Sequence, residues 1–94
     1  MSDETSTSDG RVHLSTNYRF QWEEAQQAYV LLYPEGMIKL NGPAGEILKR
    51  CDGTLTESQL IEVLRQEFPG NDDLEADVRG FLVDARTRGW IRGG

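Results

Sequence analysis

Cysteine and histidine are almost absent from this sequence, which has one residue of each, Cys51 and His13. Zinc and iron–sulfur sites usually take four such ligands, so we expect no metal site and no cofactor of that kind. A single cysteine also excludes a disulfide within the chain. Cys51 completes an apolar helical pattern and His13 lies in a polar segment, which favours packing and solvated roles over catalysis. The sequence therefore predicts a protein that is not an enzyme.

Positive charge and long apolar runs are also scarce. The chain has ten Lys and Arg residues and 16 Asp and Glu residues, which gives a formal net charge of −6 and an isoelectric point near 4.6. Nucleic acid and anionic membrane surfaces would repel such a chain. No run of 18 apolar residues and no signal segment is present, which predicts a soluble, intracellular, cytoplasmic protein without a nucleic-acid or membrane partner.

The first 17 residues carry little apolar material. Apart from Met1, only Val12 and Leu14 stand among Ser, Thr, Asp, Glu and other polar residues. This composition predicts a disordered tail over residues 1–17 and one domain over residues 18–92. A domain of this size has a single small core, so we expect no deep active-site cavity.

Three segments after the tail have strand patterns. Polar and aromatic residues alternate over residues 19–23, and residues 28–33 are continuously apolar, which suits the central strand of an antiparallel sheet. Pro34 and Gly36 then favour a type I turn with a bulge, in which Gly36 would take a positive φ. Residues 37–41 form the third strand, which we expect at the edge of the sheet.

Three helices are predicted after the strands. Asn41, Gly42 and Pro43 begin the first, and Gly53 is expected to end it. Thr56 and Gln59 form a capping box for the second helix, and Asn71 caps the third. The predicted buried positions are Ala44, Ile47, Leu48 and Cys51, then Leu60, Ile61, Leu64 and Phe68, and finally Leu74, Val78, Phe81, Leu82 and Ala85.

The order of these elements predicts an α+β fold. A three-stranded antiparallel sheet followed by a three-helix bundle is a winged-helix-like arrangement. Winged helices often bind DNA, but the third helix begins with Asn71, Asp72 and Asp73, where phosphate contacts would be needed. An exposed edge strand instead offers backbone groups to an extended peptide, or to a second copy of the chain.

Several short segments together resemble the PqqD family. They are RFQWE (19–23), VLLYPEGM (30–37), KLN (39–41), IL (47–48), CDG (51–53), DV (77–78), FL (81–82) and GWI (89–91). They occur in the family's order and spacing over residues 18–92. The long acidic N-terminal tail and the terminal Gly93 and Gly94 depart from the family pattern, which leaves the role of the tail open.

The resemblance implies a non-catalytic peptide chaperone in pyrroloquinoline quinone biosynthesis. Such proteins bind the precursor peptide PqqA and present it to PqqE, a radical S-adenosylmethionine enzyme that cross-links a Glu and a Tyr of the peptide. In this group the leader segment of the peptide commonly adds as a strand beside the third strand, against the last helix. The implied peptide-binding residues are Met37, Ile38, Lys39, Leu40 and Asn41 of the strand and Val78, Leu82, Val83 and Arg86 of the helix.

Two questions stay open at this point. The sequence does not decide whether residues 37 and 39 or residues 38 and 40 direct their backbone groups outward. It also allows a different class of function, a dimerising scaffold whose sheet edge pairs with itself.

Overall fold

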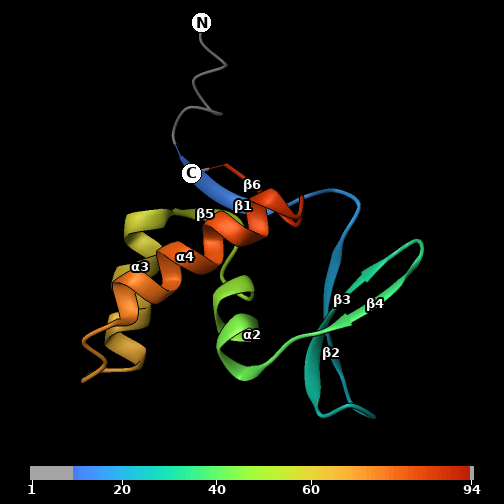
Figure 1. Cartoon of the computed structure of the whole chain (residues 1–94), viewed down its shortest axis with the longest axis horizontal. Helices are drawn as coiled ribbons and strands as arrows, with labels where there is room; N and C mark the ends of the chain where they lie inside the picture. The colour runs from blue at the N-terminus through green and yellow to red at the C-terminus, as the bar shows by residue number, and fades with distance from the viewer. Residues whose placement is uncertain (1–9, 94) are drawn as a thin grey trace, which may run out of the picture.

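The computed structural model describes residues 10–93, which form an α+β fold of two small antiparallel sheets and three helices (Figure 1). The strands are β1 (Arg11–Leu14), β2 (Arg19–Glu23), β3 (Ala28–Tyr33), β4 (Gly36–Lys39), β5 (Asp52–Thr56) and β6 (Ile91–Arg92). The helices are α2 (Gly42–Leu48), α3 (Glu57–Glu67) and α4 (Leu74–Thr87). None of these described helices is long and apolar enough to cross a membrane.

The first sheet has the strand order β2-β3-β4 and is antiparallel throughout, as the sequence predicts. The central strand β3 buries Val30 and Leu31 completely, because neighbouring strands and side chains cover it on both sides. Its turn to β4 differs from the prediction. Tyr33 pairs with Gly36 across a two-residue loop, and Gly36 does not have a positive φ, so the predicted bulge is wrong.

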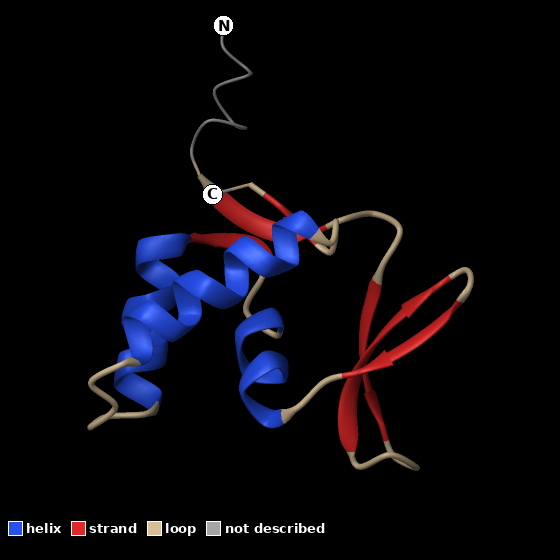
Figure 2. Cartoon of the chain, in the orientation of Figure 1, coloured by secondary structure: helices blue, strands red, loops and turns tan. Residues whose placement is uncertain are grey.

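The structure contains a second sheet, with the strand order β5-β1-β6 (Figure 2). The sequence does not predict this sheet. Its central strand β1 lies within the segment predicted to be a disordered tail, and Val12 of this strand is only 1% exposed. The prediction is therefore wrong for residues 11–14, while residues 1–9 lie outside the described part of the chain. A four-residue strand gives little local signal, because its stability comes from pairing with distant segments.

The predicted end of the first helix also needs correction. Helix α2 ends at Leu48, and Gly53, with φ +86°, lies in β5 instead of stopping a helix. The beginning of α2 follows the prediction: Pro43 stands in the first turn, and the Asn41 side chain accepts a hydrogen bond from the Ala44 N–H at 2.8 Å. This cap places the end of β4 directly beside the first turn of α2.

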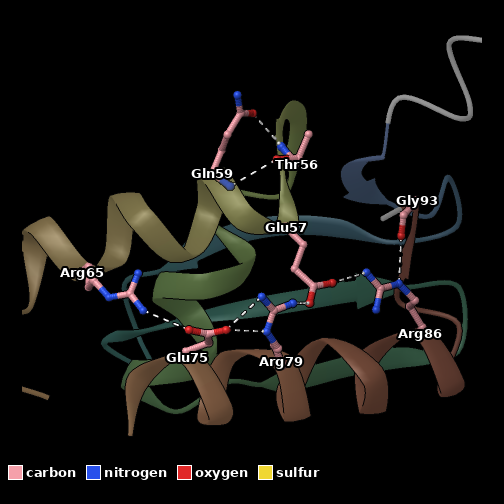
Figure 3. Close-up of polar contacts among 8 residues, drawn as sticks. All are labelled: Thr56, Glu57, Gln59, Arg65, Glu75, Arg79, Arg86 and Gly93. Carbon is pink, nitrogen blue, oxygen red and sulfur yellow. Dashed lines mark hydrogen bonds and ion pairs between the residues drawn. The ribbon is translucent and has the colours of Figure 1, made fainter. Parts of the chain in front are cut away.

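Helix α3 begins with the predicted capping box (Figure 3). The Thr56 hydroxyl accepts from the Gln59 N–H at 3.2 Å, and the Gln59 side chain accepts from the Thr56 N–H at 2.9 Å. At the other end of α3 the prediction for Phe68 is wrong. This residue follows the last helical residue and is 43% exposed instead of buried.

Helix α4 lies across α3 in the view of Figure 1, and four of its five predicted core positions, Leu74, Val78, Leu82 and Ala85, are buried. Asp73, not Asn71, is its N-cap, while the Asn71 side chain accepts from the Asp73 N–H just before the helix. Gly89, with φ +82°, ends this segment as expected. The helices and both sheets share one core, whose most buried large side chains are Leu31, Leu48, Leu60, Leu64 and Leu82.

Candidate peptide-binding site

Strand β4 is an edge of the first sheet, because β3 is its only neighbour among the described strands. The Leu40 N–H donates to the Tyr29 carbonyl at 3.0 Å just beyond β4. Backbone groups alternate in direction along an antiparallel strand, so Ile38 and Leu40 bond toward β3. The N–H and C=O groups of Met37 and Lys39 therefore point outward, and this settles the question that the sequence leaves open.

The side chains of β4 alternate in the same way. Ile38 packs against the core and Leu40 is 5% exposed, so these two side chains lie on the inner face of the sheet. Met37 and Lys39 lie on the outer face and are exposed. A peptide that pairs with this edge would hence place every second side chain beside Ile38, toward the helices.

The four helix residues expected at the site lie on different faces of α4. Val78 is buried and lines a surface cavity. Leu82 is completely buried, so it supports the core and presents no surface to a ligand in this structure. Val83 is 60% exposed and lies five residues after Val78, about 140° around the helix, so it faces away from the cavity.

Arg86 lies on the side of α4 that faces α3, where it joins a polar network (Figure 3). Its side chain donates to Glu57 at 3.0 Å and to the Gly93 carbonyl at 2.8 Å. Glu57 also accepts from Arg79 at 2.7 Å. Arg86 therefore ties the C-terminal segment to α3 and α4, which is a structural role separate from the β4 edge.

The network continues along the exposed surface between α3 and α4. Glu75 accepts from Arg79 at 3.1 Å and from Arg65 at 3.0 Å. The hydrogen bond from Arg79, followed by that from Arg65, lowers the pKa of Glu75, and the hydrogen bond to Glu75 raises the pKa of Arg79. These shifts accompany one ion pair within α4 and one between α3 and α4, and they identify no catalytic acid or base.

A cavity of about 430 Å³ lies between the start of α2 and the junction of α3 and α4. Its lining residues are Gly42, Pro43, Glu46, Ile47, Leu64, Phe68, Asn71, Leu74, Asp77 and Val78. Sequence reasoning placed only Val78 at the site. The sequence predicts a core position for Phe68 and no binding role for Asp77, and only the folded structure brings them to one cavity.

The described residues show no reactive centre at this site. Burial, with a contribution from the Asp52 charge, raises the pKa of the Cys51 thiol to about 12, so the thiolate form is disfavoured. The Cys51 thiol also donates to the Ile47 carbonyl at 3.3 Å. Within residues 10–93, no three His, Cys, Asp or Glu residues are grouped closely enough to hold a metal ion.

The chain is similar to known proteins over most of its length. The chain is 50% identical over 78 residues to a PqqA binding protein of Azotobacter vinelandii, covering 83% of this chain and 85% of the relative. It is 51% identical over 74 residues to a PqqA binding protein of Acinetobacter baylyi, covering 79% of this chain and 75% of the relative.

A solved structure shows the same fold. The solution NMR structure of the PqqD truncation of Methylobacterium extorquens PqqCD, a functional and stand-alone recognition element for ribosomally synthesised and post-translationally modified peptides, matches with a TM-score of 0.69 and 28% identity. The match covers 86% of this chain and 87% of that chain. The family pattern described as "Coenzyme PQQ synthesis protein D (PqqD)" spans residues 28–91, more than half of the sequence. This chain belongs to the PqqD family.

Proposed function

We propose that this protein is a non-catalytic recognition element that binds the precursor peptide PqqA in pyrroloquinoline quinone biosynthesis. The observation that carries the proposal is the unpartnered edge of β4, whose outward backbone groups belong to Met37 and Lys39. Relatives also support the proposal, because this chain is identical to two PqqA binding proteins at about half of the aligned positions. The same fold occurs in a stand-alone recognition element for modified peptides.

In this proposal the peptide becomes the fourth strand of the first sheet. Hydrogen bonds to Met37 and Lys39 give affinity that depends little on peptide sequence, while side chains on the inner face provide selection. Ile38 and Leu40 form the floor beside the peptide, and Asn41 holds the start of α2 through its cap. Val78 contributes the helix wall.

The other three helix residues have different parts in the proposal. Leu82 supports the wall from the core, and Arg86 holds α4 against α3 and the C-terminal segment. Val83 faces away from β4, so the role that the resemblance implies for it is not retained. This difference makes Val83 a useful control position on the same helix.

The hairpin of β3 and β4 followed by three helices supports a winged-helix-like arrangement. The acidic, predominantly polar sequence supports a soluble, cytoplasmic protein. By resemblance to its family, the bound peptide is presented to PqqE, a radical S-adenosylmethionine enzyme, which performs the chemistry. Binding of the peptide here would raise its effective concentration at that enzyme without any reaction on this chain.

Titration of ¹⁵N-labelled protein with PqqA tests the proposed site. We expect the largest amide shifts at residues 37–41 and beside Val78, and small shifts at Val83. Shifts that avoid β4 would exclude the edge as the binding site. Titration with a scrambled peptide of the same composition controls for nonspecific binding.

Substitution of Lys39 by proline gives a sharper test. Proline removes the outward N–H of Lys39 and leaves the ladder between β3 and β4 intact, because prolines are tolerated where the N–H of an edge strand faces solvent. We expect Lys39→Pro to remain folded and to lose PqqA binding, while Lys39→Ala binds like the wild type. Equal binding by both variants would contradict pairing at this edge.

The free edge of β4 could also pair with the same edge of a second copy, as in a dimerising scaffold. Mass measurement across protein concentrations, with and without PqqA, separates the two functions. A monomer that binds PqqA supports the recognition element. An obligate dimer that leaves β4 inaccessible to PqqA supports the scaffold.

A further inference from the structure

The cavity beside α2 is large enough to hold one large side chain of a ligand. Ile47, Leu64, Leu74 and Val78 are buried and form apolar walls, while Phe68 is 43% exposed. Its volume of about 430 Å³ falls in the range of known ligand pockets, roughly 300 to 1,000 Å³. The apolar walls favour a large hydrophobic side chain as the occupant.

The cavity lies close to the end of β4 in the sequence. Lys39 is the last residue of β4, and Gly42 and Pro43, which follow within four positions, line the cavity. An extended peptide advances about 3.3 Å per residue, so two or three residues beyond its pairing with Lys39 would reach the cavity. A peptide that extends past Lys39 toward α2 therefore comes near the cavity in either strand direction.

The charges at the cavity favour a ligand with a basic residue next to its apolar side chain. Glu46 and Asp77 are the charged lining residues, and neither is basic. Glu46 is already paired with Arg50 at 2.9 Å. The carboxylate of Asp77 has no hydrogen bond or ion pair with any residue in the described part of the chain, so it is available to a basic group of a ligand.

We propose that this cavity anchors the bound peptide through one large apolar side chain and that Asp77 pairs with a Lys or Arg close to that side chain in the peptide. This inference rests on the proposed function, since the ligand is the peptide held on β4. The anchor would make binding selective for peptides that carry a large apolar residue next to a basic one. Edge pairing alone would accept almost any extended peptide.

The test measures PqqA affinity of variants with matched controls. Phe68→Ala shortens the cavity wall and is compared with Val83→Ala, which changes an exposed apolar residue of α4 outside the cavity. Asp77→Asn is compared with Asp72→Asn, which removes the same charge just before the helix. We expect Phe68→Ala to weaken binding roughly tenfold and Asp77→Asn about three- to fivefold, with less than a twofold change in each control.

Two further measurements give independent results. In an alanine scan of PqqA, we expect one large apolar position to matter most to the wild type and to lose most of its effect against Phe68→Ala. In methyl spectra of the wild type, the methyl groups of Ile47, Leu64 and Val78 should shift with PqqA, while those of Val83 stay in place. The methyl spectra do not depend on the folding of any variant.

The outcomes separate the anchor from the recognition function. If wild-type protein does not bind PqqA, the proposed function fails and the anchor fails with it. If PqqA binds and shifts the amides of β4, but Phe68→Ala and Asp77→Asn behave like their controls and the cavity methyl groups stay in place, the anchor alone is overturned.

Discussion

Replacement of Leu82 by alanine separates a core role from a peptide-contacting role for this residue. Leu82 has no exposed surface and belongs to the cluster shared by the helices and both sheets. Removing a buried leucine side chain costs transfer free energy and leaves a cavity, together about 3 kcal/mol. A domain of this size is stable by about 5 to 10 kcal/mol, so most molecules should remain folded at 25 °C.

Urea unfolding followed by circular dichroism measures this loss. With a urea dependence of about 1.5 kcal/mol per molar for a small domain, the midpoint for Leu82→Ala should fall by about 2 M. Val83→Ala is the matched control, because Val83 is 60% exposed, and it should change the unfolding free energy by less than about 0.5 kcal/mol. Affinity for PqqA per folded molecule should be the same for Leu82→Ala and wild type within a factor of about two.

Two results would refute this reasoning. A midpoint for Leu82→Ala equal to that of Val83→Ala would show that Leu82 is not packed in the core. Retained stability together with a large loss of PqqA affinity would show that Leu82 contacts the peptide directly, as the family resemblance alone implies.

Other substitutions test the remaining structural assignments. Glu57→Gln should lower the unfolding free energy by about 1 kcal/mol, measured by urea titration, because Glu57 joins the partly buried Arg86 to α3. Thr56→Ala should cost about 1 kcal/mol by loss of the capping box, and Thr56→Ser should restore most of it in thermal unfolding. Cys51, with its pKa raised to about 12, should react with iodoacetamide at pH 8 only in urea, as mass spectrometry would show.

Local patterns account for the part of the fold that sequence reasoning predicts correctly. Strand β2 alternates with period two, β3 is continuously apolar, and Thr56 with Gln59 carries its own cap, so each signal lies within a few residues. The apolar positions of α4 repeat at helical spacing, and four of its five predicted core residues are buried, with Phe81 partly so. Such features do not depend on the rest of the chain.

The second sheet could not be predicted because its strands depend on one another. Strand β1 is polar apart from Val12 and Leu14, β6 has two residues, and β5 contains Gly53 at positive φ. Strands β5 and β6 each pair only with β1 among the described strands, and both are distant from it in the sequence. A glycine after an apolar helical pattern is typical of a helix end, and only tertiary pairing gives Gly53 its place in β5.

The candidate site shows the same division between local and tertiary information. The free edge follows from strand order, and the outward direction of Met37 and Lys39 follows from a two-residue turn that sequence reasoning replaced with a bulge. The cavity requires α2, α3 and α4 to meet, so Phe68 and Asp77 had no local signal that joined them. Residues of a binding groove are therefore harder to assign than the strand that borders it.

The outward direction of the Met37 and Lys39 backbone groups depends on the register of β4 in the sheet. Leu40 and Ile38 reach the inner face because their backbone groups bond to β3, and the same alternation directs Met37 and Lys39 outward. A one-residue slip of β4 would expose Leu40 and turn the outward groups inward at once. Burial of Leu40 thus stabilises the register that peptide pairing requires. Side-chain changes on the inner face should alter folding and binding together, whereas removal of the Lys39 N–H alone should alter binding and leave the fold in place.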